Sequence, residues 1–280
     1  MKRKIALLSD IHGNLTALDA VLEDAINEQV TEYWLLGDIV MQGPASSEIF
    51  KRIEPLQPSV WLKGNWDELL LCTADKTAID LDNPTDIYTA RLGMNLLERT
   101  TQEQLETLRQ LPVHITQTIN GVTISLSHHL TDKNWGRELV PTNPQENFDR
   151  LFLTNDVDVA IYGHTHVQLM RYGSAGQLII NPGSIGNPFY QRKKMRKAAR
   201  ANYAVLEIDD QGMTEVFFKQ IPYDVEKEIE RAHACNFPYV ELYIEQIKRG
   251  ITRTHDWSYL DQINDRCGYK FEVDAYLREK

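Results

Sequence analysis

Residues 4–15 read KIALLSDIHGNL, the pattern of a buried strand that runs into a helix. The stretch Lys4–Leu8 ends in a polar Ser-Asp pair, and a short apolar run of this kind is typical of a strand in a parallel sheet. Asn14 is a preferred helix-capping residue. The residues after it carry apolar side chains at helical spacing: Leu15, Leu18, Val21, Leu22, Ala25 and Ile26. We therefore expect a strand over Lys4–Leu8 and a helix from Leu15.

The same strand-to-helix pattern returns further along the chain. Tyr33–Leu36 predicts a strand that ends at Gly37-Asp38, and a helix is expected from about Ala45. Val60–Lys63 predicts a third strand, which ends at Gly64-Asn65. Strands that alternate with helices in this way indicate a parallel sheet with helices on its faces.

The remainder of the chain predicts a second sheet and more helices. Glu68–Gln110 is mostly helical in pattern, with a break at Asn83-Pro84, and Asn120-Gly121 is the preferred two-residue turn of a β-hairpin. Strands are expected over seven ranges: Val113–Ile119, Val122–Ser127, Val157–Tyr162, Gln168–Tyr172, Leu178–Ile180, Tyr203–Ile208 and Met213–Lys219. Because the pattern is helical from Val225 onward, the simplest organisation is one α/β domain with two sheets and a helical C-terminal appendage.

The composition is that of an ordinary globular protein, with 280 residues, 42% hydrophobic and 25% charged. The net charge of -10 argues against broad electrostatic attraction to nucleic acid or anionic lipid. The three cysteines form no CxxC pair, which fits a reducing compartment. The apolar run Ile5–Leu8 is shorter than the about 7–15 residues of a secretion signal, and no uncharged run approaches the about 18 residues of a membrane helix. We therefore expect a cytoplasmic protein with no membrane partner.

Polar motifs follow five of the predicted strands. They are Asp10-Ile11-His12, Gly37-Asp38, Gly64-Asn65-Trp66-Asp67, Ser127-His128-His129 and Gly163-His164-Thr165-His166. Each motif by itself is more often a turn or a cap, but five of the eight histidines fall within this set. Ligands of α/β sheets bind beyond the carboxyl ends of the strands. We therefore expect the five motifs to converge on one site.

The residue types in these motifs are metal ligands, because aspartate, asparagine and histidine together suit Mn, Fe, Co or Zn. In an extended chain, residues two apart point the same way, so Asp10 and His12 are expected to share a site. The same holds for His164 and His166. Seven candidate ligands exceed the needs of one ion and suit two ions with a bridging carboxylate: Asp10, His12, Asp38, Asn65, His128, His164 and His166. Two close metals acidify a bridging water and hold phosphate oxygens, which favours in-line attack on phosphorus.

The order of these motifs resembles that of the calcineurin-like metallophosphoesterases, from Ile5 to about Gly250, and the segment 181–186 (NPGSIG) resembles their small bacterial branch. The resemblance implies a four-layer α/β/β/α sandwich over residues 1–250, with a helical extension over residues 251–280. It also implies two divalent ions, with Mn or Fe preferred and Zn, Co or Ni as alternatives. One ion would take Asp10, His12, Asp38 and His166, and the other would take Asp38, Asn65, His128 and His164, with Asp38 bridging.

Three residues next to the ligands, His129, Trp66 and Asp67, are not implied to bind metal, and the resemblance suggests a different role for each. The family usually has His-Gly where this chain has His128-His129, so His128 aligns with the ligand, and His129 either acts on the substrate or faces solvent. Many relatives carry a histidine where this chain has Trp66, and tryptophan cannot transfer a proton. Trp66 either stacks on a nucleobase of the substrate or packs in the core. Asp67 is expected to serve catalysis by orienting the loop or a ligand, without binding metal itself.

A basic run follows the Asn-Pro pair at 187–188. Six of the nine residues from 192 to 200 are basic: Arg192, Lys193, Lys194, Arg196, Lys197 and Arg200. A charge run is usually a solvated face, but the resemblance places this one at the rim of the site. Arg192, Lys193 and Lys194 are therefore candidates for binding phosphates beyond the one attacked.

These features together favour a nucleotide polyphosphate as substrate. They resemble bacterial, streptococcal-type phosphodiesterases with asymmetric diadenosine tetraphosphate hydrolase activity, which produce ATP and AMP. Alternatives are a cyclic-nucleotide or oligonucleotide phosphodiesterase. A protein phosphatase is less favoured, because those enzymes have Asp-Arg-Gly where residues 41–44 here read MQGP. A non-catalytic scaffold is disfavoured, because no ligand position is vacant. We expect a small-molecule nucleotide partner and no stable nucleic-acid complex, and the sequence leaves an oligomer open.

Overall fold

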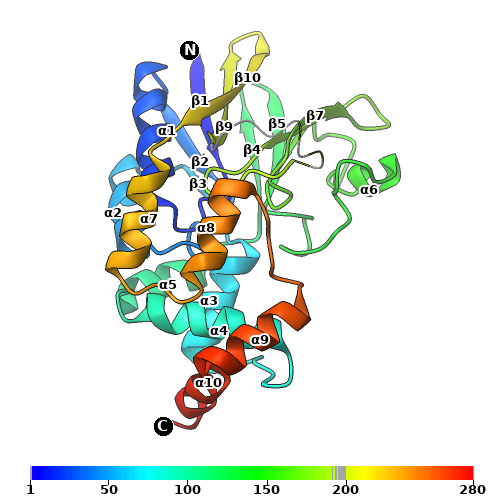
Figure 1. Ribbon diagram of the computed structural model, residues 1–280. Helices are drawn as coiled ribbons and strands as arrows, with labels where there is room; N and C mark the ends of the chain where they lie inside the picture. Colours follow the sequence, from blue (N-terminus) through cyan, green and yellow to red (C-terminus); the bar gives the residue numbers. More distant parts are fainter. Residues whose placement is uncertain (1, 191, 193, 195–199, 280) are drawn as a thin grey trace.

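Two five-stranded sheets packed face to face form the centre of the molecule (Figure 1). The computed structural model describes residues 2–190, 192, 194 and 200–279. The first sheet has the order β10-β9-β1-β2-β3. Its strands are β1 (Arg3–Leu8), β2 (Glu32–Leu35), β3 (Val60–Trp61), β9 (Arg200–Asp209) and β10 (Gly212–Pro222). β1, β2 and β3 are parallel, which confirms the parallel sheet predicted from the sequence, and β9 pairs antiparallel to β1.

The second sheet has the order β4-β5-β6-β8-β7. Its strands are β4 (His114–Ile119), β5 (Val122–Ser127), β6 (Val159–Tyr162), β7 (Gln168–Tyr172) and β8 (Leu178–Pro182). β4 and β5 form the hairpin expected around Asn120-Gly121, while β5, β6 and β8 run parallel. The carboxyl ends of the parallel strands β5 and β6 can therefore also contribute residues to a site.

Side-chain alternation along β1 divides the core into layers. Ile5 and Leu7 point between the sheets, where they pack with residues such as Leu126 and Ile161 of the second sheet. Ala6 and Leu8 point the other way into the helical layer. That layer contains α1 (Leu15–Asn27), α2 (Ser47–Ile53) and α7 (Val225–Ala234), which Figure 1 shows on the outer side of the first sheet. Asn14 caps α1 as expected, because its side chain accepts a hydrogen bond from the Ala17 N–H at 3.0 Å.

The outer face of the second sheet is covered by loops and one short helix, α6 (Gln145–Asp149). Phe148 of this helix packs with Ala160 and Tyr162 of β6. The four-layer α/β/β/α fold is therefore confirmed, with a thin fourth layer. Helix α6 was not predicted, because five residues are too few to display a helical period.

Most of the other helices lie below the two sheets in Figure 1, toward the C-terminus of the chain. They are α3 (Asn65–Asp75), α4 (Pro84–Leu97), α5 (Gln102–Gln110), α8 (Val240–Arg249), α9 (Trp257–Cys267) and α10 (Tyr269–Arg278), and a 3-10 turn, η1 (Glu54–Leu56), follows α2. Val273 of α10 packs against Ile87 and Ala90 of α4. No helix in the described part of the chain is both long enough and apolar enough to cross a bilayer.

Candidate metal centre

The candidate ligands all lie just beyond strand ends. Asp10 and His12 follow β1, Asp38 follows β2, and Asn65 begins α3 after β3. In the second sheet, His128 follows β5, and His164 and His166 follow β6. Asp10, His12, Asp38 and His128 are each at most 1% exposed. The structure thus brings together the seven residues that the sequence singled out as ligands.

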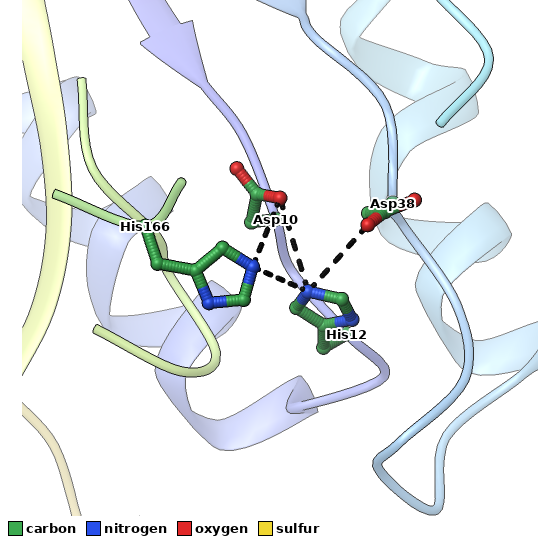
Figure 2. A group of neighbouring side chains, drawn as sticks. All are labelled: Asp10, His12, Asp38 and His166. Carbon is green, nitrogen blue, oxygen red and sulfur yellow. Dashed lines mark hydrogen bonds and ion pairs between the residues drawn. The ribbon is translucent and has the colours of Figure 1, made fainter. Parts of the chain in front are cut away.

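Four of these side chains converge on a first point (Figure 2). His166 Nε2 lies 3.2 Å from Asp10 Oδ1 and 3.0 Å from His12 Nε2. His12 Nε2 lies 3.7 Å from Asp38 Oδ2. The ligand atoms of Asp10, His12, Asp38 and His166 all lie within 4.8 Å of one another. This is the same set of four that the resemblance implied for one ion.

A second group meets on the other side of Asp38. Its members are Asp38, His128 and His164, whose ligand atoms again lie within 4.8 Å of one another. The Asn65 Oδ1 atom lies 3.2 Å from His128 Nε2 and 2.8 Å from His164 Nδ1. Asp38 Oδ2, which faces His12 in the first group, is 3.3 Å from His128 Nε2. One carboxylate oxygen therefore belongs to both groups.

The polar atoms at these points fit divalent cations. Asp10 Oδ1 is buried without a well-aligned hydrogen-bond donor, and its polar neighbours are His166 Nε2 at 3.2 Å and His12 Nε2 at 3.8 Å. Two imidazole Nε2 atoms face each other at 3.0 Å next to it. A buried carboxylate oxygen without a donor is costly unless a cation compensates it. Nitrogen and oxygen donors of this mixture suit Mn, Fe, Co or Zn, so the residues fit two metal ions that share Asp38.

Backbone carbonyls set the orientation of three ligand imidazoles. His128 Nδ1 donates to Leu36 O at 2.6 Å, and His166 Nδ1 donates to Asn187 O at 2.7 Å. His164 Nε2 donates to Gly136 O at 2.9 Å. With one ring nitrogen protonated and held, the other carries the lone pair toward the cluster. These carbonyl partners were missed from the sequence, because every residue type has a carbonyl.

The ligand residues adopt an unusual backbone conformation. φ is +53° at Asp10, +50° at His12, +54° at Asp38, +63° at His164 and +59° at His166. The expectation that extended chain directs Asp10 and His12 the same way is therefore wrong, as it is for His164 and His166. Their side chains converge through left-handed backbone instead. Such residues are uncommon outside glycine and cluster at functional sites, where surrounding contacts hold them.

Hydrogen bonds between neighbouring loops hold this backbone in place. Asp10 N donates to Gly37 O at 3.1 Å, and His12 N donates to Asp38 O at 2.9 Å. Close packing adds to this restraint, because a Cβ on Gly64 would lie 2.0 Å from Asp38 Oδ1. A Cβ on Gly163 would lie 2.1 Å from Ser9 Oγ. The glycines that precede Asn65 and His164 are thus required by the close approach of the ligand loops.

Charge and burial act differently on the histidines. Burial opposes protonation of His128, but the Asp38 carboxylate, the Asp10 charge and the Leu36 carbonyl together raise the pKa of His128 to about 9. A metal ion at this histidine would therefore have to displace a proton. Burial lowers the pKa of His12 to about 4. Burial and the neighbouring His128 imidazole lower the pKa of His164 to about 3. His12 and His164 are therefore neutral near pH 7, which is the form that binds a metal.

Asp67 holds two ligand loops without reaching the cluster itself. Its Oδ2 accepts from Asp38 N at 2.8 Å and from Gly64 N at 2.9 Å, and its Oδ1 accepts from Ile39 N at 3.0 Å and from Val40 N at 3.4 Å. The carboxylate is fully buried. Burial, together with the nearby Asp38 charge, raises the pKa of Asp67 to about 7, while the backbone donors oppose this increase. The contacts assign Asp67 to positioning the Asp38 loop.

His129 and Trp66 are both buried. His129 is 0% exposed, so the alternative that it faces solvent is wrong. Its ring packs against His164 with centroids 4.7 Å apart, and its Nε2 is 3.0 Å from Glu138 Oε2. Trp66 is 7% exposed, belongs to the main core and meets the His12 ring edge-on. This burial favours packing over base stacking for Trp66.

The basic run lies only partly within the described residues. Arg192 and Lys194 are exposed. Arg200 belongs to β9, and its Nη1 donates to Gln220 O at 3.1 Å. Lys193, Arg196 and Lys197 lie outside the described residues. A phosphate-binding role for Arg192, Lys193 and Lys194 stays a prediction.

The amino-acid sequence matches a known protein family and several relatives. The model of the calcineurin-like phosphoesterase superfamily domain matches residues 3–211. An uncharacterized protein of Methanocaldococcus jannaschii is 29% identical over 251 residues, which cover 82% of this chain and 92% of that protein. A symmetrical bis(5'-nucleosyl)-tetraphosphatase of Yersinia pestis is 38% identical over 88 residues, which are 31% of this chain and 30% of that enzyme.

Solved structures agree with the fold. A hypothetical protein of Pyrococcus horikoshii superposes with a TM-score of 0.69 at 21% identity, over 89% of this chain and 99% of that one. A metallophosphoesterase of Sphaerobacter thermophilus superposes with a TM-score of 0.64 at 23% identity, over 89% of this chain and 100% of that one. At these identities the likeness concerns the fold alone.

Proposed function

The chain belongs to the calcineurin-like phosphoesterase superfamily, and from this premise we propose that it is a two-metal hydrolase of nucleotide phosphoanhydride or phosphodiester bonds. The observation that carries the proposal is the shared position of Asp38 Oδ2, which lies 3.7 Å from His12 Nε2 and 3.3 Å from His128 Nε2. A carboxylate oxygen between two sets of nitrogen ligands suits a pair of ions that share it.

The residues of this chain would hold and orient the reacting groups. Asp10, His12, Asp38 and His166 would bind one divalent ion, and Asp38, Asn65, His128 and His164 would bind the other. Two such ions supply an acidified water and positive charge for phosphoryl oxygens. The Leu36, Asn187 and Gly136 carbonyls hold the imidazoles in the ligating form, and Asp67 fixes the Asp38 loop.

Proton supply to the leaving group distinguishes this chain from relatives with an imidazole at position 66. Trp66 carries no transferable proton, and burial lowers the pKa of His129 to about 4, so His129 is neutral near pH 7. A substrate whose leaving group is already a weak base needs little general-acid assistance. Phosphoanhydrides meet this condition, because the departing group is itself a phosphate.

We propose diadenosine tetraphosphate as the substrate, cleaved asymmetrically to ATP and AMP. A phosphoanhydride fits the Trp66 substitution, and the basic run offers charge for additional phosphates. The short match to a symmetrical bis(5'-nucleosyl)-tetraphosphatase supports this substrate class. Symmetrical cleavage of the same substrate would instead produce two ADP.

Chromatography of the products tests both parts of this proposal. Protein that has been stripped of metal and reloaded with Mn is incubated with diadenosine tetraphosphate. ATP and AMP in equal amounts are the expected products. Two ADP would retain the substrate and overturn the asymmetric position of attack. Absence of product, alongside hydrolysis of a cyclic nucleotide or an oligonucleotide, would overturn the proposed substrate and favour a phosphodiesterase.

Neutralising the basic run is expected to weaken binding of polyphosphates selectively. In a variant with Arg192, Lys193 and Lys194 changed to glutamine, we expect KM for diadenosine tetraphosphate to rise about fivefold to tenfold. Exposed charge pairs contribute about 0.2–1 kcal/mol each, and a tetraphosphate can engage several of them. The kcat/KM for bis(p-nitrophenyl) phosphate should stay within about twofold, because this diester has no further phosphates.

A matched variant controls for the change in net charge. Lys227, Lys248 and Arg249 are exposed on α7 and α8, and their replacement by glutamine removes the same charge elsewhere. This control should leave both KM values unchanged. Equal loss on both substrates in the first variant would count against a rim role for the basic run.

A further inference from the structure

A pocket of about 870 Å³ opens beside the second group of metal ligands. Asn65 and His164 form part of its wall, so it is continuous with the cluster. Leu69 and Cys72 of α3 form another part, and Trp135 contributes from the loop between β5 and α6. Ligand pockets of drug-sized molecules have volumes of about 300–1,000 Å³. A group attached to a phosphate at the cluster therefore has room to extend here.

The pocket combines the apolar surfaces of Leu69, Cys72 and Trp135 with polar side chains. Its two carboxylates, Glu68 and Glu138, are balanced by two cations, Lys133 and Arg137. Trp135 is 62% exposed, and the Lys133 Nζ atom lies 5.0 Å from its ring centroid. Glu138 forms an ion pair with Lys133, and Glu68 accepts from Asn134 Nδ2 at 2.9 Å. An exposed aromatic ring in a concave, charge-compensated site is suited to a flat and uncharged partner.

Trp135 is fixed relative to the metal ligands by its own loop. The next residue, Gly136, accepts a hydrogen bond from His164 Nε2 at 2.9 Å. The loop is further closed by Asn143 Nδ2, which donates to Glu138 O at 2.9 Å, and by Leu139, which is fully buried. Trp135 therefore directly precedes a residue that orients His164, and the contacts of the loop hold the Trp135 backbone beside the cluster.

The C-terminal extension reaches the same pocket. His255 lines it and belongs to the connection between α8 and α9, which Figure 1 shows as an extended segment. The preceding residue is anchored, because Thr85 Oγ1 donates to Thr254 O at 2.7 Å. Arg253 adds ion pairs to Glu245 and Asp256 at 3.0 Å and 2.9 Å. His255 thus contributes to the pocket wall from a segment whose neighbouring residues are held by these contacts.

We propose that this pocket is the base subsite of the enzyme, where the nucleobase next to the attacked phosphate stacks on Trp135. The proposal rests on the proposed function, because it assumes that a nucleotide phosphate lies at the cluster. It assigns the aromatic contact to Trp135, in the loop after β5, and leaves Trp66 as a core residue. Base–aromatic stacking contributes about 1–3 kcal/mol per base, which corresponds to about 5- to 150-fold in affinity at 1.4 kcal/mol per tenfold.

Two probes that differ only in the base test this subsite. The dissociation constants of AMP and ribose 5-phosphate are measured by calorimetry on the Mn-loaded protein. The wild type is expected to bind AMP about 5- to 150-fold more tightly than ribose 5-phosphate. Trp135→Ala should remove this preference without weakening ribose 5-phosphate, and Trp135→Phe should keep most of it. Trp257→Ala, which removes another exposed tryptophan (57% exposed), should change neither value.

Several outcomes would overturn the base subsite. They are equal binding of both probes by the wild type, no measurable binding of AMP, and an AMP preference that survives Trp135→Ala. Equal weakening of both probes in Trp135→Ala would also reject it, because that result indicates general damage to the loop. Failure of the proposed function is a separate result: loss of the AMP preference in Trp135→Ala, in a protein that does not hydrolyse diadenosine tetraphosphate, would support the subsite and reject the reaction.

Discussion

Replacing Asp38 with asparagine is expected to lower kcat by about 10³-fold or more. Asp38 Oδ2 is the one atom that both groups of ligands share, at 3.7 Å from His12 Nε2 and 3.3 Å from His128 Nε2. Asparagine keeps the shape and can still accept from Trp66 N through the oxygen that replaces Oδ1. It removes the negative charge that two cations share. A loss of about 4 kcal/mol in charge stabilisation corresponds to about 10³-fold in rate.

Metal content supplies the second measurement on this variant. Elemental analysis should give two ions per chain for the wild type and fewer for Asp38→Asn, with an unchanged circular dichroism spectrum. Asp261→Asn, at an exposed position on α9, is the matched control and should keep both ions and full activity. Turnover within about tenfold of the wild type in Asp38→Asn would contradict the two-metal assignment, as would full metal content together with full activity.

The chemical identity of the site could be predicted because it depends on residue types at strand ends. We could select the seven side chains that the fold brings together from their residue types alone. They are the aspartate, asparagine and histidine residues that follow β1, β2, β3, β5 and β6. Parallel strands place their carboxyl ends at one edge, so the convergence followed from the strand pattern. The helix cap at Asn14 and the hairpin at Asn120-Gly121 were predictable for a similar reason, because both depend on short-range chemistry.

The features that could not be predicted depend on backbone conformation and distant packing. A positive φ at Asp10 or His164 has no sequence signal, because neither residue type requires it. The carbonyls of Leu36, Asn187 and Gly136 orient imidazoles, but a carbonyl is common to all residues. Trp135 stands in a loop without periodicity, and only the folded chain places it beside His164. Glycine before a ligand was the one available signal of a close approach, as Gly64 and Gly163 illustrate.

Replacing Asp67 with alanine is expected to weaken metal binding through the loop that carries Asp38. The Asp67 carboxylate accepts from four backbone N–H groups, of Asp38, Ile39, Val40 and Gly64, and is fully buried. Alanine would leave these donors without a partner, at a cost of about 1–3 kcal/mol for each buried group left unsatisfied. Loss of a partner that orients a metal ligand typically costs about 10–100-fold in affinity. We expect a decrease of this size in Mn affinity, measured by calorimetry, and a lower midpoint of thermal unfolding.

A destabilised variant of the same helix separates positioning from general stability. Leu70 is fully buried on α3, and Leu70→Ala is expected to cost about 2–5 kcal/mol of unfolding free energy. It should bind Mn within about twofold of the wild type, because its side chain holds no ligand loop. If Asp67→Ala does not fold, Asp67→Asn retains two of the acceptor contacts and should show a smaller loss. If Asp67→Ala and Leu70→Ala bind Mn with equal affinity, the positioning role is wrong. Asp67 would then contribute only to the stability of the fold, because Asp38 would stay in place without its carboxylate.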